Sequence, residues 1–147
     1  MSESDLDAEQ EAVMRDKKLA WELHDYQPEN PKILELAQSV LAREPTFTGM
    51  IILIALQRHA CGEIEEARRL LQELMGRRDR QYRNAARYLR DLEFGDGKFA
   101  ESLRLGEIVL RESPEVDWLD LMDYANSLIY TGNRLEGWRK YDEAVAI

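Results

Sequence analysis

Hydrophobic residues along most of this chain recur at intervals of three and four, which is the spacing of one face of an α-helix and differs from the alternation of a β-strand. Between residues 46 and 147 the pattern predicts three helix pairs, whose first helices span 48–60, 79–94 and 117–130. The inward faces of the three second helices are expected to be Ala67, Leu70, Leu71 and Leu74; Phe99, Leu103, Gly106, Val109 and Leu110; and Trp138, Tyr141, Ala144 and Val145. The pattern therefore predicts an all-α protein.

A less regular pair is predicted before these three. Its first helix is expected at about 8–25 and its second helix at 31–43. The segment 40–45 resembles the segment 109–114, and each ends on a proline, which stops a helix of this kind. The second helix is expected to turn five hydrophobic side chains inward, namely Ile33, Leu36, Ala37, Val40 and Leu41.

Glycine recurs with a period of 35 residues. The three glycines are Gly62, Gly97 and Gly132, and a small residue follows each of them five positions later, namely Ala67, Ser102 and Gly137. Glycine adopts the left-handed conformation at the end of a helix without a Cβ penalty, so each glycine is expected to separate the two helices of a pair. A small residue lets two helix axes approach closely, so each small residue is expected where the paired helices cross.

These features together resemble the tetratricopeptide repeat family, which has a glycine between two helices, a small residue early in the second and a proline after it. The resemblance covers residues 46–147 closely and 12–45 loosely. It implies a right-handed α-α superhelix, a solenoid of about three clear helix pairs plus a degenerate N-terminal pair. Three features depart from the family: the period of 35, Arg90 where the family has glycine or alanine, and Pro28 in place of an interhelix glycine. Another antiparallel helical array is the alternative.

Composition favours one folded domain. The chain has 147 residues, of which 44% are hydrophobic, and this length is ordinary for a single core. Residues 1–11 hold five acidic side chains and no basic one, so we expect them to be disordered and the repeat domain to span 12–147. The same segment lacks the basic and apolar regions of a signal peptide, and Cys61 is the single cysteine, so we expect the cytoplasm.

The net charge argues against nucleic acids as partners, and the short apolar runs argue against a membrane-spanning segment. The net charge is −9, which repels phosphate backbones on average. The longest apolar run, residues 50–56, is far shorter than the roughly 20 residues that cross a bilayer.

The resemblance implies a concave groove, lined by the first helix of each pair, that holds a peptide or helix of a partner protein. The positions that correspond to this groove are Ile52, Leu56, His59, Asn84, Arg87, Asp91, Met122 and Asn126. For Ile52, as for Leu119 and Ile129, a place in the core is the competing interpretation. The family's carboxylate clamp is incomplete here, because apolar residues stand where donors are expected. An apolar groove favours an amphipathic helix or an extended hydrophobic segment.

Four arginines form a stripe along one predicted helix. Arg80, Arg83, Arg87 and Arg90 advance by three, four and three residues, so they share one face. One interpretation is a solvated face paired with acidic neighbours such as Glu73, Asp91 and Glu93. The other is an anion-binding edge of the groove that takes an acidic peptide, for which residues 1–11 would be an intramolecular candidate.

The sequence predicts no catalytic residue, metal site or cofactor. His59 and Cys61 lie two positions apart, which points their side chains to different faces of a helix. We therefore expect an interaction module or adaptor, with a small chaperone for secretion substrates and an anion or nucleic-acid binder as alternatives. The last predicted helix has no polar capping helix after it, so we expect it to self-associate, to contact a partner, or to belong to a longer protein.

Overall fold

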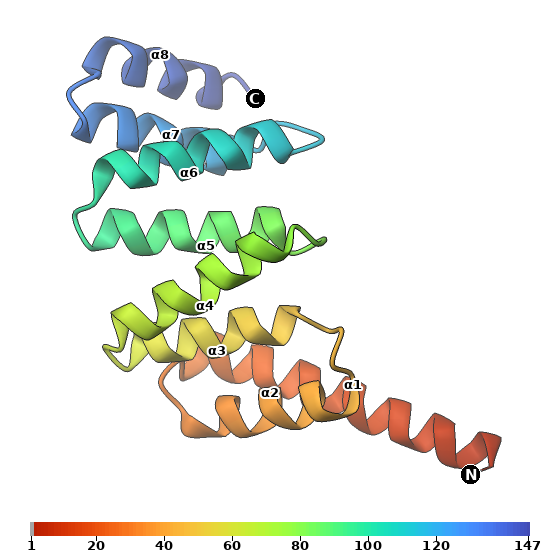
Figure 1. Cartoon of the computed structure of the whole chain (residues 1–147). Coiled ribbons are helices and arrows are strands. Elements are labelled where there is room, and N and C mark those ends of the chain that lie inside the picture. Colours follow the sequence, from red (N-terminus) through yellow and green to blue (C-terminus); the bar gives the residue numbers. More distant parts are fainter. Residues whose placement is uncertain (1) are drawn as a thin grey trace. The chain divides into compact units, whose positions relative to one another are not determined.

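The computed structural model describes residues 2–147, and in this range the chain forms eight α-helices and no strand. The helices are α1 (Glu3–Tyr26), α2 (Pro31–Arg43), α3 (Gly49–Ala60), α4 (Ile64–Arg77), α5 (Tyr82–Gly95), α6 (Phe99–Glu112), α7 (Trp118–Tyr130) and α8 (Arg134–Val145) (Figure 1). The helical prediction is confirmed, and α2 has the bounds that the sequence predicts.

The described chain divides into two compact units rather than the single domain expected from its length. The N-terminal unit ends at Leu71 and the C-terminal unit begins at Gln72, so the boundary falls inside α4. Such a division is physically natural, because helices in these units pack mainly on their neighbours in sequence.

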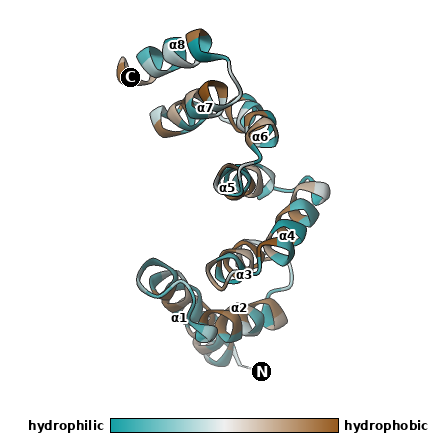
Figure 2. Ribbon diagram, turned by 90° about the vertical axis from the view of Figure 1, so that its left-hand side faces the viewer, coloured by the Kyte–Doolittle hydropathy of each residue, from teal (hydrophilic) through white to brown (hydrophobic). Residues whose placement is uncertain are grey.

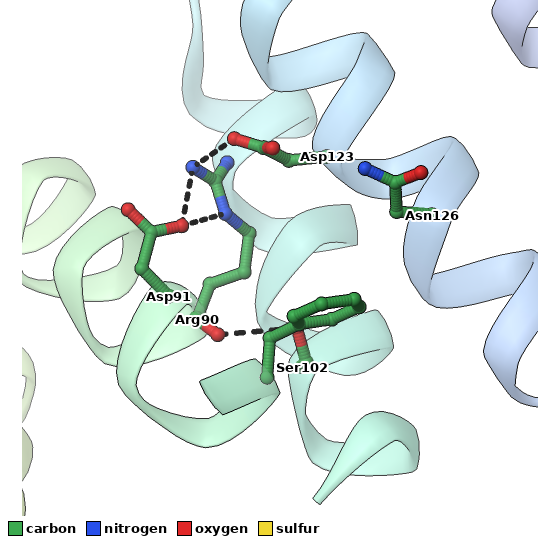
Figure 3. Close-up of a pocket in the computed structure, with 6 residues that line it drawn as sticks. Arg90, Asp91, Ser102, Asp123 and Asn126 are labelled. Atoms are coloured by element: carbon green, nitrogen blue, oxygen red, sulfur yellow. Dashed lines mark hydrogen bonds and ion pairs between the residues drawn. The ribbon is translucent and has the colours of Figure 1, made fainter. Parts of the chain in front are cut away.

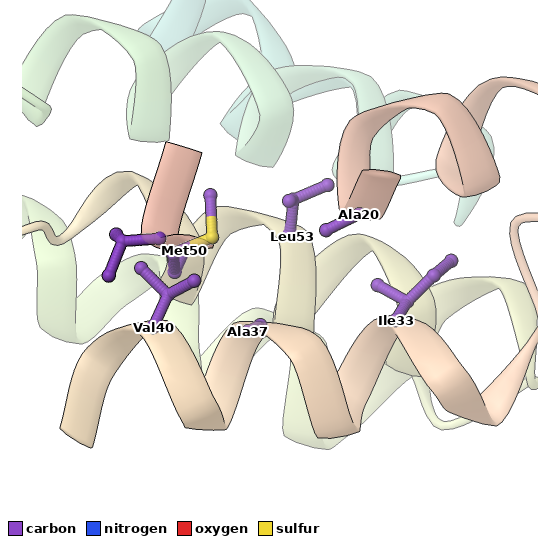
Figure 4. Close-up of a cluster of buried hydrophobic side chains, with 7 residues drawn as sticks. Ala20, Ile33, Ala37, Val40, Met50 and Leu53 are labelled. Carbon is purple, nitrogen blue, oxygen red and sulfur yellow. The ribbon is translucent and has the colours of Figure 1, made fainter. Parts of the chain in front are cut away.

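Three helices build the core of the N-terminal unit. Helices α1, α2 and α3 contact one another, and their buried side chains interlock as Figure 4 shows. The side chains are Val13 and Ala20 from α1, Ile33, Ala37 and Val40 from α2, and Met50 and Leu53 from α3. Leu36 and Leu41 pack against this cluster, so the inward face predicted for α2 is confirmed.

The acidic segment at the start of the chain is helical, which corrects the expectation of disorder for residues 3–11. The Ser2 side chain accepts a hydrogen bond from the Asp5 N–H, and the Asp5 carboxylate accepts one from the Ser2 N–H. This reciprocal arrangement is a capping box. Hydrogen bonds from the side chain and backbone of Ser2 lower the pKa of Asp5. Acidic side chains also favour a helix N-terminus, so their presence here promotes a helix.

The C-terminal unit stacks α5 on α6, α6 on α7 and α7 on α8. Helix α6 has a helix on both sides, and its predicted inward face is only partly correct: Gly106 and Val109 are buried, but Phe99, Leu103 and Leu110 are half-buried. Its buried residues are Ser102, Leu105, Gly106, Ile108 and Val109. Figure 2 shows hydrophobic and hydrophilic residues on separate sides of helices such as α5.

Helix α8 packs mainly on α7, and its expected inward face is only partly correct. Gly137 and Ala144 are buried, whereas Trp138 is 60% exposed and Val145 is 81% exposed. The self-association predicted for this helix stays a prediction.

The three repeated glycines close three turns of the same geometry. Their φ angles are +83° at Gly62, +78° at Gly97 and +92° at Gly132, so each is left-handed as predicted. In the first turn, the N–H of Gly62 donates to His59 O at 3.0 Å and that of Glu63 donates to Arg58 O at 2.9 Å. The other two turns repeat both bonds: Gly97 to Phe94, Lys98 to Glu93, Gly132 to Ile129 and Asn133 to Leu128. This pair of bonds defines the Schellman motif.

The small residues lie where the sequence places them, at tightly packed positions. Ala67 and Ser102 are fully buried. At Gly137 an added Cβ would lie 2.6 Å from Ile129 Cγ1 and 3.0 Å from the backbone oxygen of Ala125. Helix α8 therefore approaches α7 too closely for any side chain at this position.

This close approach predicts opposite effects for two glycine-to-alanine changes within helices of the C-terminal unit. Gly137→Ala should lower the free energy of unfolding by about 1 kcal/mol or more, because overpacking outweighs the gain in helix propensity. Gly76→Ala, where an added Cβ meets nothing within 4 Å, should leave stability unchanged or raise it by up to about 1 kcal/mol. Urea unfolding followed by circular dichroism measures both, and a gain in both variants would contradict the close helix contact.

Candidate functional site

A buried arginine lies at the centre of the C-terminal unit. The Arg90 side chain on α5 is only 3% exposed, and its guanidinium group reaches across to α7. Nη1 donates to Asp120 Oδ1 at 3.0 Å, and Nη2 donates to Asp123 Oδ2 at 2.9 Å. The Nε of the same group donates to Asp91 Oδ1 at 3.0 Å. Figure 3 shows the guanidinium group of Arg90 between Asp91 and Asp123.

Arg87, which also lies on α5, binds the same carboxylate, that of Asp120. Arg87 Nε donates to Asp120 Oδ1 at 3.0 Å, and Arg87 Nη2 donates to Asp120 Oδ2 at 2.6 Å, which is a two-bond fork. The Asp120 side chain is 3% exposed and therefore depends on these donors. We call Arg87, Arg90, Asp91, Asp120 and Asp123 the charge cluster.

The charge cluster holds two guanidinium groups against three carboxylates, so it carries one net negative charge when all five groups are ionised. Burial raises the pKa of Asp120, but hydrogen bonds from Arg87 and Arg90 outweigh it and hold the pKa below its usual value. Burial raises the pKa of Asp123, and the neighbouring Asp91 and Asp120 add to the rise despite Arg90. The pKa of Arg90 is lowered by burial but raised more by Asp91, Asp120 and Asp123.

Two serines connect the three helices beneath the charge cluster. The hydroxyl of Ser102 on α6 lies 3.1 Å from the backbone oxygen of Arg90 and 3.1 Å from the hydroxyl of Ser127 on α7. Both serines are fully buried. The small residue of this repeat thus provides a hydrogen bond as well as room for close packing.

A pocket of about 120 Å³ opens beside the charge cluster. Its lining comes from α5, α6 and α7 and consists of Arg90, Asp91, Phe94, Ser102, Asp123 and Asn126. We call it the α5–α7 pocket. The Phe94 ring packs on the Phe99 and Tyr130 rings, with centroids 5.1 and 5.2 Å apart, and Asn126 Oδ1 accepts a 2.6 Å hydrogen bond from Tyr141.

The predicted groove residues differ in exposure between the two units. In the N-terminal unit Ile52 is 2% exposed and belongs to the core, which corrects its place in the groove, while Leu56 is half-buried and His59 is exposed. In the C-terminal unit Asp91 is exposed and the remaining four are half-buried, namely Asn84, Arg87, Met122 and Asn126. Asp91 and Asn126 lie together in the α5–α7 pocket.

The predicted arginine stripe does not form one open anion-binding surface. Arg87 and Arg90 are bound by aspartates, and Arg83 Nη1 lies 3.4 Å from the Ser113 hydroxyl, whereas Arg80 is exposed. The alternative interpretation named Asp91 among the acids that pair with the stripe, and Asp91 does contact Arg90, but that interpretation placed the stripe on a solvated face. Helix α6 packs on α5, and the guanidinium group of Arg90 is buried.

Sequence reasoning missed Asp120 and Asp123, although a signal for them exists. Both lie on the predicted helix 117–130 three positions apart, as do Arg87 and Arg90 on the preceding first helix. Two residues three positions apart lie on one face of a helix. When such a pair is followed about one repeat later by a pair of opposite charge, the two pairs are candidates for contact between their helices.

No family model matches this chain, and the comparison with curated proteins finds no relative. Within residues 2–147 no group of three or more histidine, cysteine or acidic side chains is arranged to hold a metal ion. None of the helices in that range is both long enough and apolar enough to cross a membrane. Cys61 Sγ lies 3.3 Å from Gln57 Nε2 and 3.7 Å from the backbone oxygen of Glu29.

The charge cluster predicts a large stability loss when one buried carboxylate becomes neutral. Asp120→Asn should lower the free energy of unfolding by about 3 kcal/mol, because it leaves two guanidinium groups without their shared counter-charge. Glu101→Gln is the control, since it breaks a more exposed pair with Arg104 on one helix and should cost less than about 1 kcal/mol. Denaturant unfolding at neutral pH measures the two; equal losses would contradict a buried network.

The lowered pKa of Asp120 also predicts how the cost of Asp120→Asn depends on pH. A carboxyl group whose pKa is lower in the folded than in the unfolded chain stabilises the fold at pH values above the unfolded-state pKa. This stabilisation is lost as the pH falls through the lower folded-state pKa. The difference between wild type and Asp120→Asn should therefore be full at pH 7 and shrink below pH 3.8, the usual value for this group. Urea unfolding from pH 7 to pH 3 tests this, and a constant difference would contradict the ion pairing.

Proposed function

We propose that this protein is an interaction module or adaptor, and that its C-terminal unit binds a segment of a partner protein on the surface formed by α5 and α7. One observation carries the proposal. The α5–α7 pocket opens between these two first helices, and polar side chains from both helices line it beside a rigid aromatic ring. A small recess with a few fixed polar groups is typical of a place that receives one side chain of a partner.

The proposed fold behind this function is a right-handed solenoid like that of the tetratricopeptide repeat family. Three Schellman turns 35 residues apart and a buried small residue five positions after each glycine support it. Arg90, which departs from the family pattern, fits in the helix because its long side chain reaches Asp120 and Asp123 on α7. The departure therefore does not count against the proposal.

At the α5–α7 pocket, binding of a side chain is favoured over catalysis by the size of the pocket and the state of its charged groups. A volume of about 120 Å³ is well below the roughly 300–1,000 Å³ of pockets that hold small substrates or cofactors. The arginines of the charge cluster are occupied by aspartates, and the cluster is negative overall. This balance disfavours binding of an anion or a nucleic acid at the charge cluster.

The proposal predicts that the affinity for a partner depends on side chains along α5. The full chain, immobilised, should capture a protein from the cell that makes it, and Asn84→Ala combined with Asp91→Ala should weaken binding of the purified partner at least about tenfold. The matched control is Glu101→Ala combined with Arg104→Ala, which removes an ion pair from α6 and should leave the dissociation constant unchanged. Isothermal titration calorimetry measures all three chains.

The outcome of this experiment decides between functions. A partner that binds wild type, control and α5 variant equally would contradict the proposed surface. Capture of one defined protein supports an adaptor, whereas capture of many incompletely folded proteins supports the chaperone alternative.

A further inference from the structure

The α5–α7 pocket has the dimensions of the end of one long side chain. Its volume of about 120 Å³ is well below the roughly 300–1,000 Å³ of pockets that hold whole small-molecule ligands, so it has room for a small group only. The end of a lysine or arginine side chain is of this size. A recess this small selects its ligand by charge and hydrogen bonding at a single group.

The carboxylates in the pocket retain capacity to accept hydrogen bonds. Arg90 contacts Oδ1 of Asp91 and Oδ2 of Asp123. An ionised carboxylate accepts on both oxygens, so the second oxygen of each group remains an acceptor for a donor from outside. The Asp91 and Asp123 side chains are 55% and 33% exposed, which makes them accessible to such a donor.

The net negative charge of the charge cluster favours a positively charged ligand. Burial and the neighbouring Asp91 and Asp120 raise the pKa of Asp123, because its negative charge is shielded from water and lies close to two others. A cationic group close to Asp91 and Asp123 would offset that repulsion. An anion would instead approach a cluster whose two arginines are already bound by three carboxylates.

An aromatic wall supports the same conclusion independently of the carboxylates. Phe94 lines the pocket and is held by Phe99 and Tyr130, whose own ring centroids lie 4.8 Å apart. A fixed aromatic ring beside carboxylates suits lysine and arginine, because their methylene stems pack on apolar surfaces and their charged ends are attracted to ring faces.

We propose that the α5–α7 pocket binds the cationic end of a lysine or arginine side chain, which Asp91 and Asp123 hydrogen-bond while Phe94 packs against its stem. The inference rests on the proposed function and adds the chemistry of the partner segment: it is basic at the residue that enters this pocket. The arginine-rich helix thus presents an acidic recess, opposite in sign to the edge expected from its sequence.

Titration with small probes tests this inference without the partner. The full chain, labelled with nitrogen-15, is titrated with n-butylammonium and n-propylguanidinium chloride, and with sodium butyrate as the anionic counterpart, at constant ionic strength. Both cations should shift the backbone amide signals of Asp91, Phe94, Asp123 and Asn126 to saturation, and butyrate should leave them in place. The tighter cation identifies the preferred side chain, lysine for butylammonium and arginine for propylguanidinium.

Three variants make the titration specific. Asp91→Asn and Asp123→Asn should each weaken cation binding by at least about tenfold, since each removes a charged hydrogen-bond acceptor. Glu101→Gln removes the same charge from α6 and should leave cation binding unchanged. A native amide spectrum confirms that each variant is folded, and Asn at position 123 can still accept from Arg90.

Three results would overturn the inference. The first is that neither cation shifts these signals. The second is that butyrate shifts them as strongly as the cations do. The third is cation shifts that spread over the acidic surface and survive Asp123→Asn, which is the behaviour of general attraction to a protein of net charge −9. A partner that is lost by the α5 variant while neither cation binds would overturn this inference alone. A partner indifferent to the α5 variant would overturn the proposed function whatever the cations do.

Discussion

The organisation of the C-terminal unit depends on one requirement, which is that the buried guanidinium group of Arg90 must meet negative charge. A charge taken out of water without a partner costs several kcal/mol, so a helix that buries arginine must lie within reach of carboxylates. Asp120 and Asp123 on α7 satisfy this requirement by hydrogen-bonding Arg90 directly. The spacing of α5 and α7 follows from the length of these side chains, and the α5–α7 pocket lies in the space that results.

A buried ion pair of this kind gives specificity of packing more reliably than it gives stability. Well-packed hydrophobic side chains of similar volume often stabilise a core as much or more. The fork between Arg87 and Asp120 is directional, however, and it fixes the rotation of α7 relative to α5. The buried hydroxyl of Ser102 on α6 adds directional contacts to both helices, namely to the Arg90 backbone oxygen on α5 and to the Ser127 hydroxyl on α7. The surface that we propose to bind a partner is therefore held by polar contacts that tolerate little change.

The sequence predicted the local features of this protein well. Helix formation, the left-handed glycines and the buried small residues all depend on contacts within one helix or between a helix and the next, and a periodic pattern records such contacts directly. The bounds of α2 are predicted without error for the same reason, because Pro31 begins it and a proline follows its end. The start of α1 is harder to predict, because acidic residues are typical of disordered segments and are also favourable at a helix N-terminus.

The candidate site was harder to predict because its contacts join residues about 30 positions apart. Arg87 and Arg90 read as an exposed stripe when their helix is considered alone, and Asp120 and Asp123 carry no signal until α7 is placed beside them. Ile52 shows the converse error, since a family position suggested a groove where its neighbours in space form a core. Hydrophobic periodicity tells which face is buried, but it does not tell which polar residue on that face will find a partner.

The central claim is that Arg90 and Asp120 interact directly and hold α5 and α7 together. A double-mutant cycle with Arg90→Met, Asp120→Asn and the combined variant measures that interaction apart from the effect of each change alone. The account predicts a coupling energy of about 2 kcal/mol, with the double variant clearly more stable than the sum of the single losses implies. A coupling energy below about 0.5 kcal/mol would mean that the two side chains act independently, and it would contradict the account.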